Sequence, residues 1–325
     1  MRRKKSIPSR GAKKPYAPAL KITVLDQFSG CDLENWNALS EDLDELQRIL
    51  FFHLQPERQR KDSELLESLS RHAPVAIDLS GWCRMVDYQF SLSPLSAAGS
   101  LHGIGGRFNA GIELDPDTLV PWPALYLAQN YETAFREYYQ LQSDFIVSGL
   151  TAIEIALLPN ITHTNLQLRG HLVNLFDATR PKVLDRLVSV LAKIPLPQKA
   201  RKLALKLKLG SNEPYMISTV EMLRQAIFKS NWRVLPMQFG LPSQSQIIGD
   251  LIRRAGFEGV VYPSSKGEGR CIALFPEQLH LSSRVYLAAF APNLEVLTEL
   301  TPDTAELLSG WESLPTSIRK RYSDP

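Results

Sequence analysis

Three short segments of the chain carry polar side chains suited to chemistry, and the first is glycine-rich. Gly103-Ile-Gly-Gly-Arg-Phe-Asn109 predicts a tight loop that presents Arg107 and Asn109 with little bulk around them. A guanidinium in such a loop can grip a phosphate with two parallel hydrogen bonds, or it can fasten the loop through carbonyl contacts. The segment is not a dinucleotide-binding fingerprint, because position 108 is Phe and no apolar helix follows.

The second segment is a predicted helix that begins after Asn130. Its inward face follows the spacing i, i+4 and i+7, as in Ala134, Tyr138 and Leu141. Glu137 lies on that face, whereas Glu132 and Arg136 are predicted to lie off it. A carboxylate among inward apolar residues must form an ion pair or serve a function, because burying an unpaired charge is costly. The sequence therefore predicts a functional carboxylate or a structural ion pair, with Arg107 as one candidate partner.

The third segment is a polar turn between two predicted strands, where Ser264 and Ser265 follow Tyr262-Pro263. Strand ends often carry site residues, although an ordinary hairpin turn would look the same. The turn lacks the G-x-S-x-G motif of serine hydrolases, and the nearest histidine in sequence is His280. Ser264 is therefore interpreted as a hydrogen-bonding residue rather than a nucleophile.

Four motifs in these regions occur in a fixed order along the chain. They are GlyGlyArgPheAsn (105–109), AlaLeuTyrLeuAla (124–128), ThrAlaPheArgGlu (133–137), and GlyValValTyrProSerSer (259–265) followed by CysIleAlaLeuPhe (271–275). Together they resemble the RES family of NAD⁺-degrading toxins, which is named for an arginine, a glutamate and a serine. The resemblance covers roughly residues 75–285.

The resemblance implies a fold like that of ADP-ribosyltransferases and cleavage of NAD⁺ by hydrolysis or phosphorolysis. It implies Arg107, Glu137 and Ser264 as the catalytic residues. Asn109 and Ser265 are expected to assist substrate binding, and Tyr126 either lines the nicotinamide pocket or is plain strand core. NAD⁺ is the substrate, so no cofactor or metal is expected. The family further implies a cognate antitoxin, of the Xre-like type, as a partner.

The elements that must position these residues alternate between short strands and helices. Strands are predicted at 75–79, 124–128, within 145–158, and at 171–176, 259–263 and 270–275. Capping boxes are predicted at Ser218/Glu221 and Ser243/Gln246, and Gly256 is placed as a C-terminal cap. Because strict βα alternation is absent, the predicted class is α+β rather than a doubly wound sheet.

The catalytic domain is predicted to span 74–290, with an insertion at about 178–215. A basic flexible tail (1–35) and a helical appendage (36–73) precede it, and a C-terminal helical tail (291–325) follows. In the appendage, Ser40 is the predicted helix cap and Pro56 the predicted interruption. In the C-terminal tail, Thr301 is the predicted cap and Pro302 the first helical residue.

Composition excludes several classes of protein. The 325 residues carry a net charge of +3 and three scattered cysteines, and no run of 18 apolar residues occurs, so a cytoplasmic enzyme without disulfides or membrane spans is expected. The six histidines form no cluster spaced for metal binding. Two alternatives stay open: an ADP-ribosyltransferase acting on a macromolecule, and a non-catalytic protein-binding or nucleic-acid-binding module. The basic tail and the basic segment 199–208 would serve such a module, although the modest net charge makes nucleic acid the less favoured partner.

Overall fold

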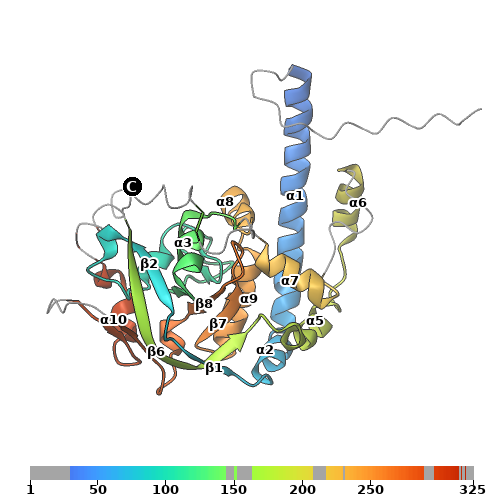
Figure 1. Ribbon diagram of the computed structural model, residues 1–325. Coiled ribbons are helices and arrows are strands. Elements are labelled where there is room, and N and C mark those ends of the chain that lie inside the picture. The colour runs from blue at the N-terminus through green and yellow to red at the C-terminus, as the bar shows by residue number, and fades with distance from the viewer. Residues whose placement is uncertain are drawn as a thin grey trace, which may run out of the picture.

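The computed structural model describes residues 30–143, 150–151, 163–207, 217–229, 231–288, 296–314, 316 and 319. It combines one large mixed sheet with helices packed around it, while a long helix, α1, stands at the side (Figure 1). This confirms the predicted α+β class.

The strands are β1 Val75–Asp78, β2 Cys83–Asp87, β3 Gly105–Gly106, β4 Asn109–Ala110, β5 Leu125–Ala128, β6 His163–Asp177, β7 Gly259–Pro263, β8 Arg270–Leu274, β9 Arg284–Leu287 and β10 Glu299–Leu300. The helices are α1 Gly30–Arg60, α2 Asp62–Ser70, α3 Tyr131–Tyr139, α5 Asp185–Leu191, α6 Gln198–Lys206, α7 Val220–Phe228, α8 Val234–Phe239, α9 Gln244–Arg254 and α10 Ala305–Ser309. Short 3-10 turns lie at η2 Tyr88–Phe90, η3 Ala98–Leu101, η5 Pro181–Leu184, η6 Pro276–Gln278 and η7 Trp311–Ser313.

The long strand β6 closes the large sheet into a ring. The strand order is β10-β9-β6-β2-β5-β8-β7, and β7 pairs again with β6. The first residues of β6 pair antiparallel with β2, whereas its last three residues pair parallel with β7. One strand can serve both neighbours because its fifteen residues extend past either of them.

Alternate residues of β5, β7 and β8 divide between two hydrophobic cores, as the period of two in a strand requires. Leu125, Ile272 and Val261 face the core that α10 covers. Tyr126 and Tyr262 face the opposite side, where α7 and α9 pack. The functional side chains discussed below lie on this second side.

The predicted strands agree well with the sheet. The segments 75–79, 124–128, 259–263 and 270–275 correspond to β1, β5, β7 and β8, and 171–176 forms part of β6. Most of the predicted β-rich stretch 145–158 lies outside the described residues. Short apolar runs bounded by Gly or Pro therefore predicted strand positions reliably here.

One of the two predicted capping boxes is confirmed. Ser243 and Gln246 form both reciprocal hydrogen bonds at the start of α9, and Gly256 follows that helix with a φ of +87°. The box at Ser218 and Glu221 is wrong, because Thr219 is the N-cap of α7 and its hydroxyl accepts from the Met222 amide. The extended backbone of Thr219 shifts the start of the helix by one residue.

The N-terminal helical prediction needs two corrections. Ser40 caps no helix, because α1 already begins at Gly30, within the predicted tail 1–35. Residues 1–29 of that tail lie outside the described residues. Pro56 does not interrupt α1, which continues to Arg60 with one internal hydrogen bond fewer. A second helix, α2, follows α1 within the predicted helical appendage 36–73.

The C-terminal helix begins later than predicted. Its N-cap is Thr304 rather than Thr301, and Pro302 precedes the helix. The hydroxyl of Thr304 accepts from the Thr301 amide, so the segment from Thr301 forms a turn before α10 starts. Only five residues of the predicted tail form this α-helix.

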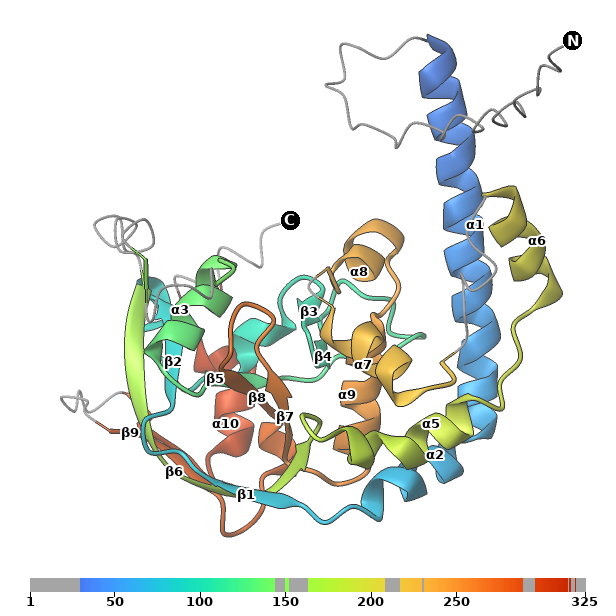
Figure 2. The same cartoon turned by 45° about the vertical axis from the view of Figure 1, so that its right-hand side comes forward.

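The basic segment near residue 200 forms a helix, α6, that lies along α1. Lys199 pairs with Glu45 at 2.6 Å, and Lys206 pairs with Asp42 at 2.7 Å. These pairs neutralise part of the positive charge that the nucleic-acid alternative relied on. Helices α7, α8 and α9 lie between α1 and the sheet (Figure 2). Within the described ranges, no helix has the length and apolar character needed to cross a membrane.

Candidate active site

The glycine-rich segment folds as a tight β3–β4 hairpin. Gly105 has a φ of +84°, and a Cβ added there would lie 2.5 Å from the Asn109 carbonyl oxygen. A Cβ on Gly106 would lie 2.3 Å from the Tyr126 hydroxyl. Both positions therefore require glycine, and the hairpin approaches β5 closely as a result.

Asn109 and Tyr126 hold this hairpin in place. The Asn109 Oδ1 accepts from the Gly106 amide and from the Tyr126 hydroxyl, each at 2.9 Å, and the Phe108 amide donates to the same hydroxyl. The Asn109 Nδ2 donates to the Trp122 carbonyl at 2.9 Å. Asn109 is fully buried and its side chain braces the loop, while its expected part in substrate binding stays a prediction. Tyr126 also lines the cavity described below.

A third brace comes from α9 and was not recognised from sequence as part of the site. The buried Gln246 amide donates to the carbonyl oxygens of Ile104, Gly106 and Asn109, at 2.8, 3.2 and 3.0 Å. A Cβ on Gly249, one turn later, would lie 2.4 Å from the Phe108 carbonyl oxygen. The helix thus packs directly on the hairpin that carries Arg107. The sequence predicted Gln246 only as part of a capping box, and that pattern does not indicate contacts with the loop.

Arg107 is buried and points from the hairpin toward the end of α7. Its Nη1 donates to the carbonyls of Ile227 and Lys229, at 3.2 and 2.9 Å, and its Nη2 donates to the Ser265 hydroxyl at 3.2 Å. The sequence left two roles open for Arg107, binding a phosphate or fastening its loop through carbonyl contacts. These hydrogen bonds correspond to the second role. A guanidinium has five N–H donors, so two remain for a ligand.

Glu137 and the two serines form the other half of the same network. The Ser264 hydroxyl donates to the Glu137 carboxylate at 2.5 Å, and the Ser265 amide donates to the same oxygen at 3.0 Å. The Lys266 amide donates to the Ser264 hydroxyl at 3.0 Å. Because Arg107 contacts Ser265, a continuous chain of hydrogen bonds joins Arg107, Ser265 and Glu137. Segments separated by up to about 160 residues therefore meet at one place.

The prediction for the faces of α3 is wrong at Arg136. This side chain is almost fully buried and pairs with Glu132 at 2.6 Å, whereas the sequence placed both residues off the inward face. The serine turn folds over this side of the helix, because a Cβ on Gly267 would lie 3.3 Å from the Arg136 Nη1. A Cβ on Gly269 would overlap the Thr133 side chain. The turn thus covers a face that would otherwise be exposed.

A cavity of about 220 Å³ opens beside this network. Its lining includes Arg107, Glu137 and Tyr126, together with Arg84 and Arg233. Arg233 also donates to the Gln140 side chain at 3.2 Å. Neither Arg84 nor Arg233 belongs to a sequence motif, so nothing in the pattern marked them. The cavity therefore combines three arginines with one carboxylate.

Trp232 lies close to two of these arginines. Its ring is buried, and the guanidinium carbons of Arg233 and Arg107 lie 4.7 and 6.0 Å from the ring centroid. Burial lowers the pKa of Arg233, and the charge of Arg107 lowers it further, while Glu137 opposes this. The mutual repulsion of the two cations would be relieved by an anion bound between them.

The remaining reactive groups of the site are unsuited to nucleophilic attack. Burial raises the pKa of the Cys83 thiol to about 12 and that of Cys271 well above its usual value, so neither forms a thiolate near neutral pH. The Ser264 hydroxyl bonds to a carboxylate and an amide, not to a histidine. Within the part of the chain that the structure describes, no group of His, Cys, Asp and Glu could hold a metal ion. The arrangement suits binding of an anion and stabilisation of a neighbouring positive charge.

Comparison with known proteins gives one family and one solved structure. The model of a family described as the RES domain matches residues 82–295, about two thirds of the chain. No curated protein matches the chain. The chain is similar to one in the crystal structure of the M. tuberculosis MbcT-MbcA toxin-antitoxin complex, with 14% sequence identity and a TM-score of 0.38. The match covers 75% of this chain and 96% of that one.

Proposed function

Since the chain belongs to the RES domain family, as its motifs led us to expect, we propose that it cleaves the N-glycosidic bond of NAD⁺. The observation that supports this most is that Arg107 and Glu137 line one cavity, while Ser264 hydrogen-bonds to Glu137 beside it. These residues come from a hairpin, a helix and a turn that are far apart in sequence. NAD⁺ is the substrate in this proposal, and no cofactor is invoked.

Glu137 is the proposed source of transition-state stabilisation. Breaking the bond between nicotinamide and ribose builds positive charge on the ribose, as in other glycosyl transfers. The Glu137 carboxylate lines the cavity, and its Oε1 is held by Ser264 and by the Ser265 amide. These bonds fix the carboxylate, and no cation of the described residues pairs with it, so its negative charge stays available to the ribose.

Ser264 is the proposed positioning contact. Its hydroxyl donates to Glu137 and accepts from the Lys266 amide, which orients the carboxylate toward the cavity. Nicotinamide is already cationic in NAD⁺ and leaves as a neutral molecule, so its departure needs no metal and no covalent serine intermediate.

The arginines are the proposed binding groups for the diphosphate of NAD⁺. Arg107 keeps two N–H donors that bond to no described residue, and the Arg233 guanidinium lies near the same Trp232 ring. A diphosphate between them would offset the repulsion of two buried cations. The cavity of about 220 Å³ has room for one end of the dinucleotide, and the remainder would extend across its rim.

The products of the reaction test the proposal. Full-length protein is incubated with NAD⁺ in buffers with and without inorganic phosphate, and the products are separated by chromatography. Nicotinamide with ADP-ribose indicates hydrolysis, and nicotinamide with a phosphorylated ADP-ribose indicates phosphorolysis. Label from NAD⁺ appearing on macromolecules in a lysate would instead support the ADP-ribosyltransferase alternative.

We also propose a cognate antitoxin, of the Xre-like type, as a partner. A protein that destroys NAD⁺ harms its own cell unless it is inhibited, and the family resemblance leads to this expectation. Expression of this chain alone should therefore arrest growth while cellular NAD⁺ falls. Normal growth with abundant soluble protein would count against the toxin role, while the chemistry would still be tested by the product assay.

A further inference from the structure

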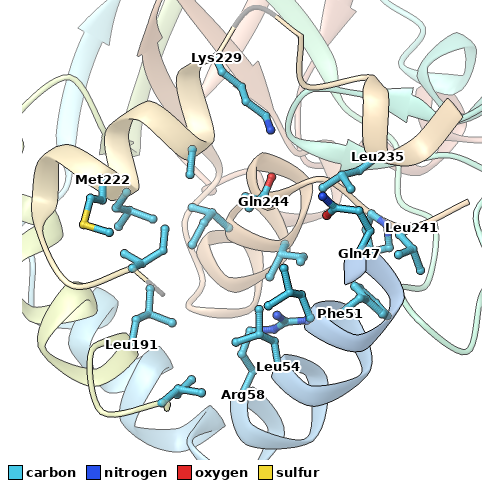
Figure 3. Close-up of a pocket in the computed structure, with 18 of the residues that line it drawn as sticks. Gln47, Phe51, Leu54, Arg58, Leu191, Met222, Lys229, Leu235, Leu241 and Gln244 are labelled. Atoms are coloured by element: carbon cyan, nitrogen blue, oxygen red, sulfur yellow. The ribbon is translucent and has the colours of Figure 1, made fainter. Parts of the chain in front are cut away.

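A second cavity, of about 330 Å³, lies between α1 and the helices that cover the sheet (Figure 3). The cavity lined by Arg107 and Glu137 is called the catalytic cavity below, after its proposed function. The two cavities share no lining residue among the described residues. The walls of the second cavity are mainly aliphatic and come from five helices: α1, α5, α7, α8 and α9. Leu50, Leu191, Leu223, Leu235 and Ile247 each represent one of them. Its volume falls within the usual range for small-molecule sites, which is about 300–1,000 Å³.

A single arginine without a counterion faces this apolar space. Arg58 makes no hydrogen bond or ion pair with any described residue, and its nearest aromatic contact is the Phe51 ring, 5.8 Å away. Burial lowers its pKa to about 10, so it still carries its charge at neutral pH. Arg60, two residues later on α1, shows the contrast because it pairs with Glu57. Arg58 is half-buried, so its charge is only partly hydrated, and an anion bound in the cavity would offset that loss of hydration.

Two further polar groups of the cavity lack a complement among the described residues, whereas the Gln225 amide donates to Glu221. Lys229 lines the cavity, has no hydrogen bond or ion pair from its ammonium group to the described residues, and has its pKa lowered by burial. The buried Gln244 Oε1 has no hydrogen-bond donor within the described chain. No aspartate or glutamate is among the described residues that line the cavity. Figure 3 shows Lys229 and Arg58 at opposite ends, with the aliphatic side chains between them.

We propose that this cavity binds a small amphipathic carboxylate, with its acyl chain on the aliphatic walls and its carboxylate on Arg58. The guanidinium fork matches a carboxylate with two parallel hydrogen bonds, which the single ammonium of Lys229 does not provide. A methylene group is close in size to a water molecule, which occupies about 30 Å³. A cavity of 330 Å³ therefore has room for a chain of roughly ten carbons. A nucleotide or sugar would leave its many polar groups unsatisfied against these walls.

This inference does not rest on the proposed function, because it concerns a different cavity and is tested by binding. Decanoate is titrated into the full-length protein by calorimetry, with 1-decanol as an uncharged probe of the same chain length. We expect the wild type to bind decanoate at least tenfold more tightly than 1-decanol. This comparison needs no variant, so it holds even if a substitution disturbs the fold.

Arg58→Met keeps the apolar stem and removes the charge. We expect it to weaken decanoate binding by about 10- to 100-fold, the usual cost of losing a hydrogen-bonded ion pair, and to leave 1-decanol binding unchanged. Lys229→Met is the matched variant at the other end and should change decanoate affinity less. No decanoate binding at millimolar concentrations, equal affinity for the two probes, or unchanged decanoate affinity in Arg58→Met would each overturn the proposal.

Discussion

The cavity lined by Arg107 and the cavity lined by Arg58 differ in how the arginine is partnered. In the catalytic cavity, Arg107 donates to two carbonyls and a serine, and Glu137 supplies a nearby negative charge. In the apolar cavity, Arg58 has no such partner among the described residues. The first arginine is part of the architecture whether or not a ligand is bound, whereas the second gains its partner from a ligand.

The two cavities also meet at one residue. The Lys229 carbonyl accepts from Arg107 in the catalytic cavity, while the Lys229 side chain lines the apolar cavity. Substitutions in one cavity should therefore be tested against ligands of both. The expectations below use this comparison, from the largest effect to the smallest.

The largest effect is expected at Glu137. Under the proposed mechanism, Glu137→Gln keeps the hydrogen-bond geometry but loses the charge, so NAD⁺ cleavage should slow by about 10²- to 10³-fold. Decanoate binding at the other cavity should not change. Glu268→Gln is the matched control, because Glu268 is an exposed carboxylate of the same serine turn. Turnover close to wild type by a folded Glu137→Gln protein would remove Glu137 from the mechanism.

The next effect is expected at Arg107, where two roles combine. Arg107→Lys loses both the fork toward a phosphate and the two bonds to the carbonyls at the end of α7. We expect NAD⁺ affinity, measured by calorimetry, to fall by about 10- to 100-fold, together with a lower Tm. Equal affinity with a lowered Tm would show that Arg107 serves only to fasten the loop to α7.

The effect expected at Ser264 overlaps in size with that at Arg107, and the smallest effect is expected at Ser265. Ser264→Ala removes the hydroxyl bond to Glu137, and a loss of about 5- to 150-fold in rate corresponds to one such contact of roughly 1–3 kcal/mol. Ser265→Ala should cost less, because its backbone amide still donates to Glu137. Intact mass after a quenched reaction should show no adduct at Ser264. A ribosyl-Ser264 species formed at the turnover rate would make serine a nucleophile instead.

Local patterns predicted the parts of the fold that local physics determines. The strands bounded by Gly or Pro and the capping box at Ser243 are set by neighbouring residues, and the structure has them where expected. The structure also brings the three motif residues together, as the resemblance led us to expect. Whether these residues catalyse NAD⁺ cleavage stays a prediction.

The remaining features depend on tertiary contacts that spacing does not encode. Arg136 is buried where the serine turn folds over it, whereas helical periodicity placed it on the outer face. Arg233 and Trp232 reach the catalytic cavity from a segment without a motif. Pro56 was expected to end α1, yet the helix continues for one further turn. A local breaker therefore did not decide where this helix ends.

The most direct test of the central claim is a time course of NAD⁺ at equal concentrations of NAD⁺ and full-length protein. The substrate NAD⁺ and the product nicotinamide are quantified together by chromatography. Because the protein is as concentrated as NAD⁺, even slow turnover is detected. We expect NAD⁺ to disappear with an equal amount of nicotinamide formed, and Glu137→Gln to leave most of the NAD⁺ intact over the same period. NAD⁺ that stays intact with the folded wild-type protein would contradict the assignment of this cavity as an NAD⁺-cleaving site.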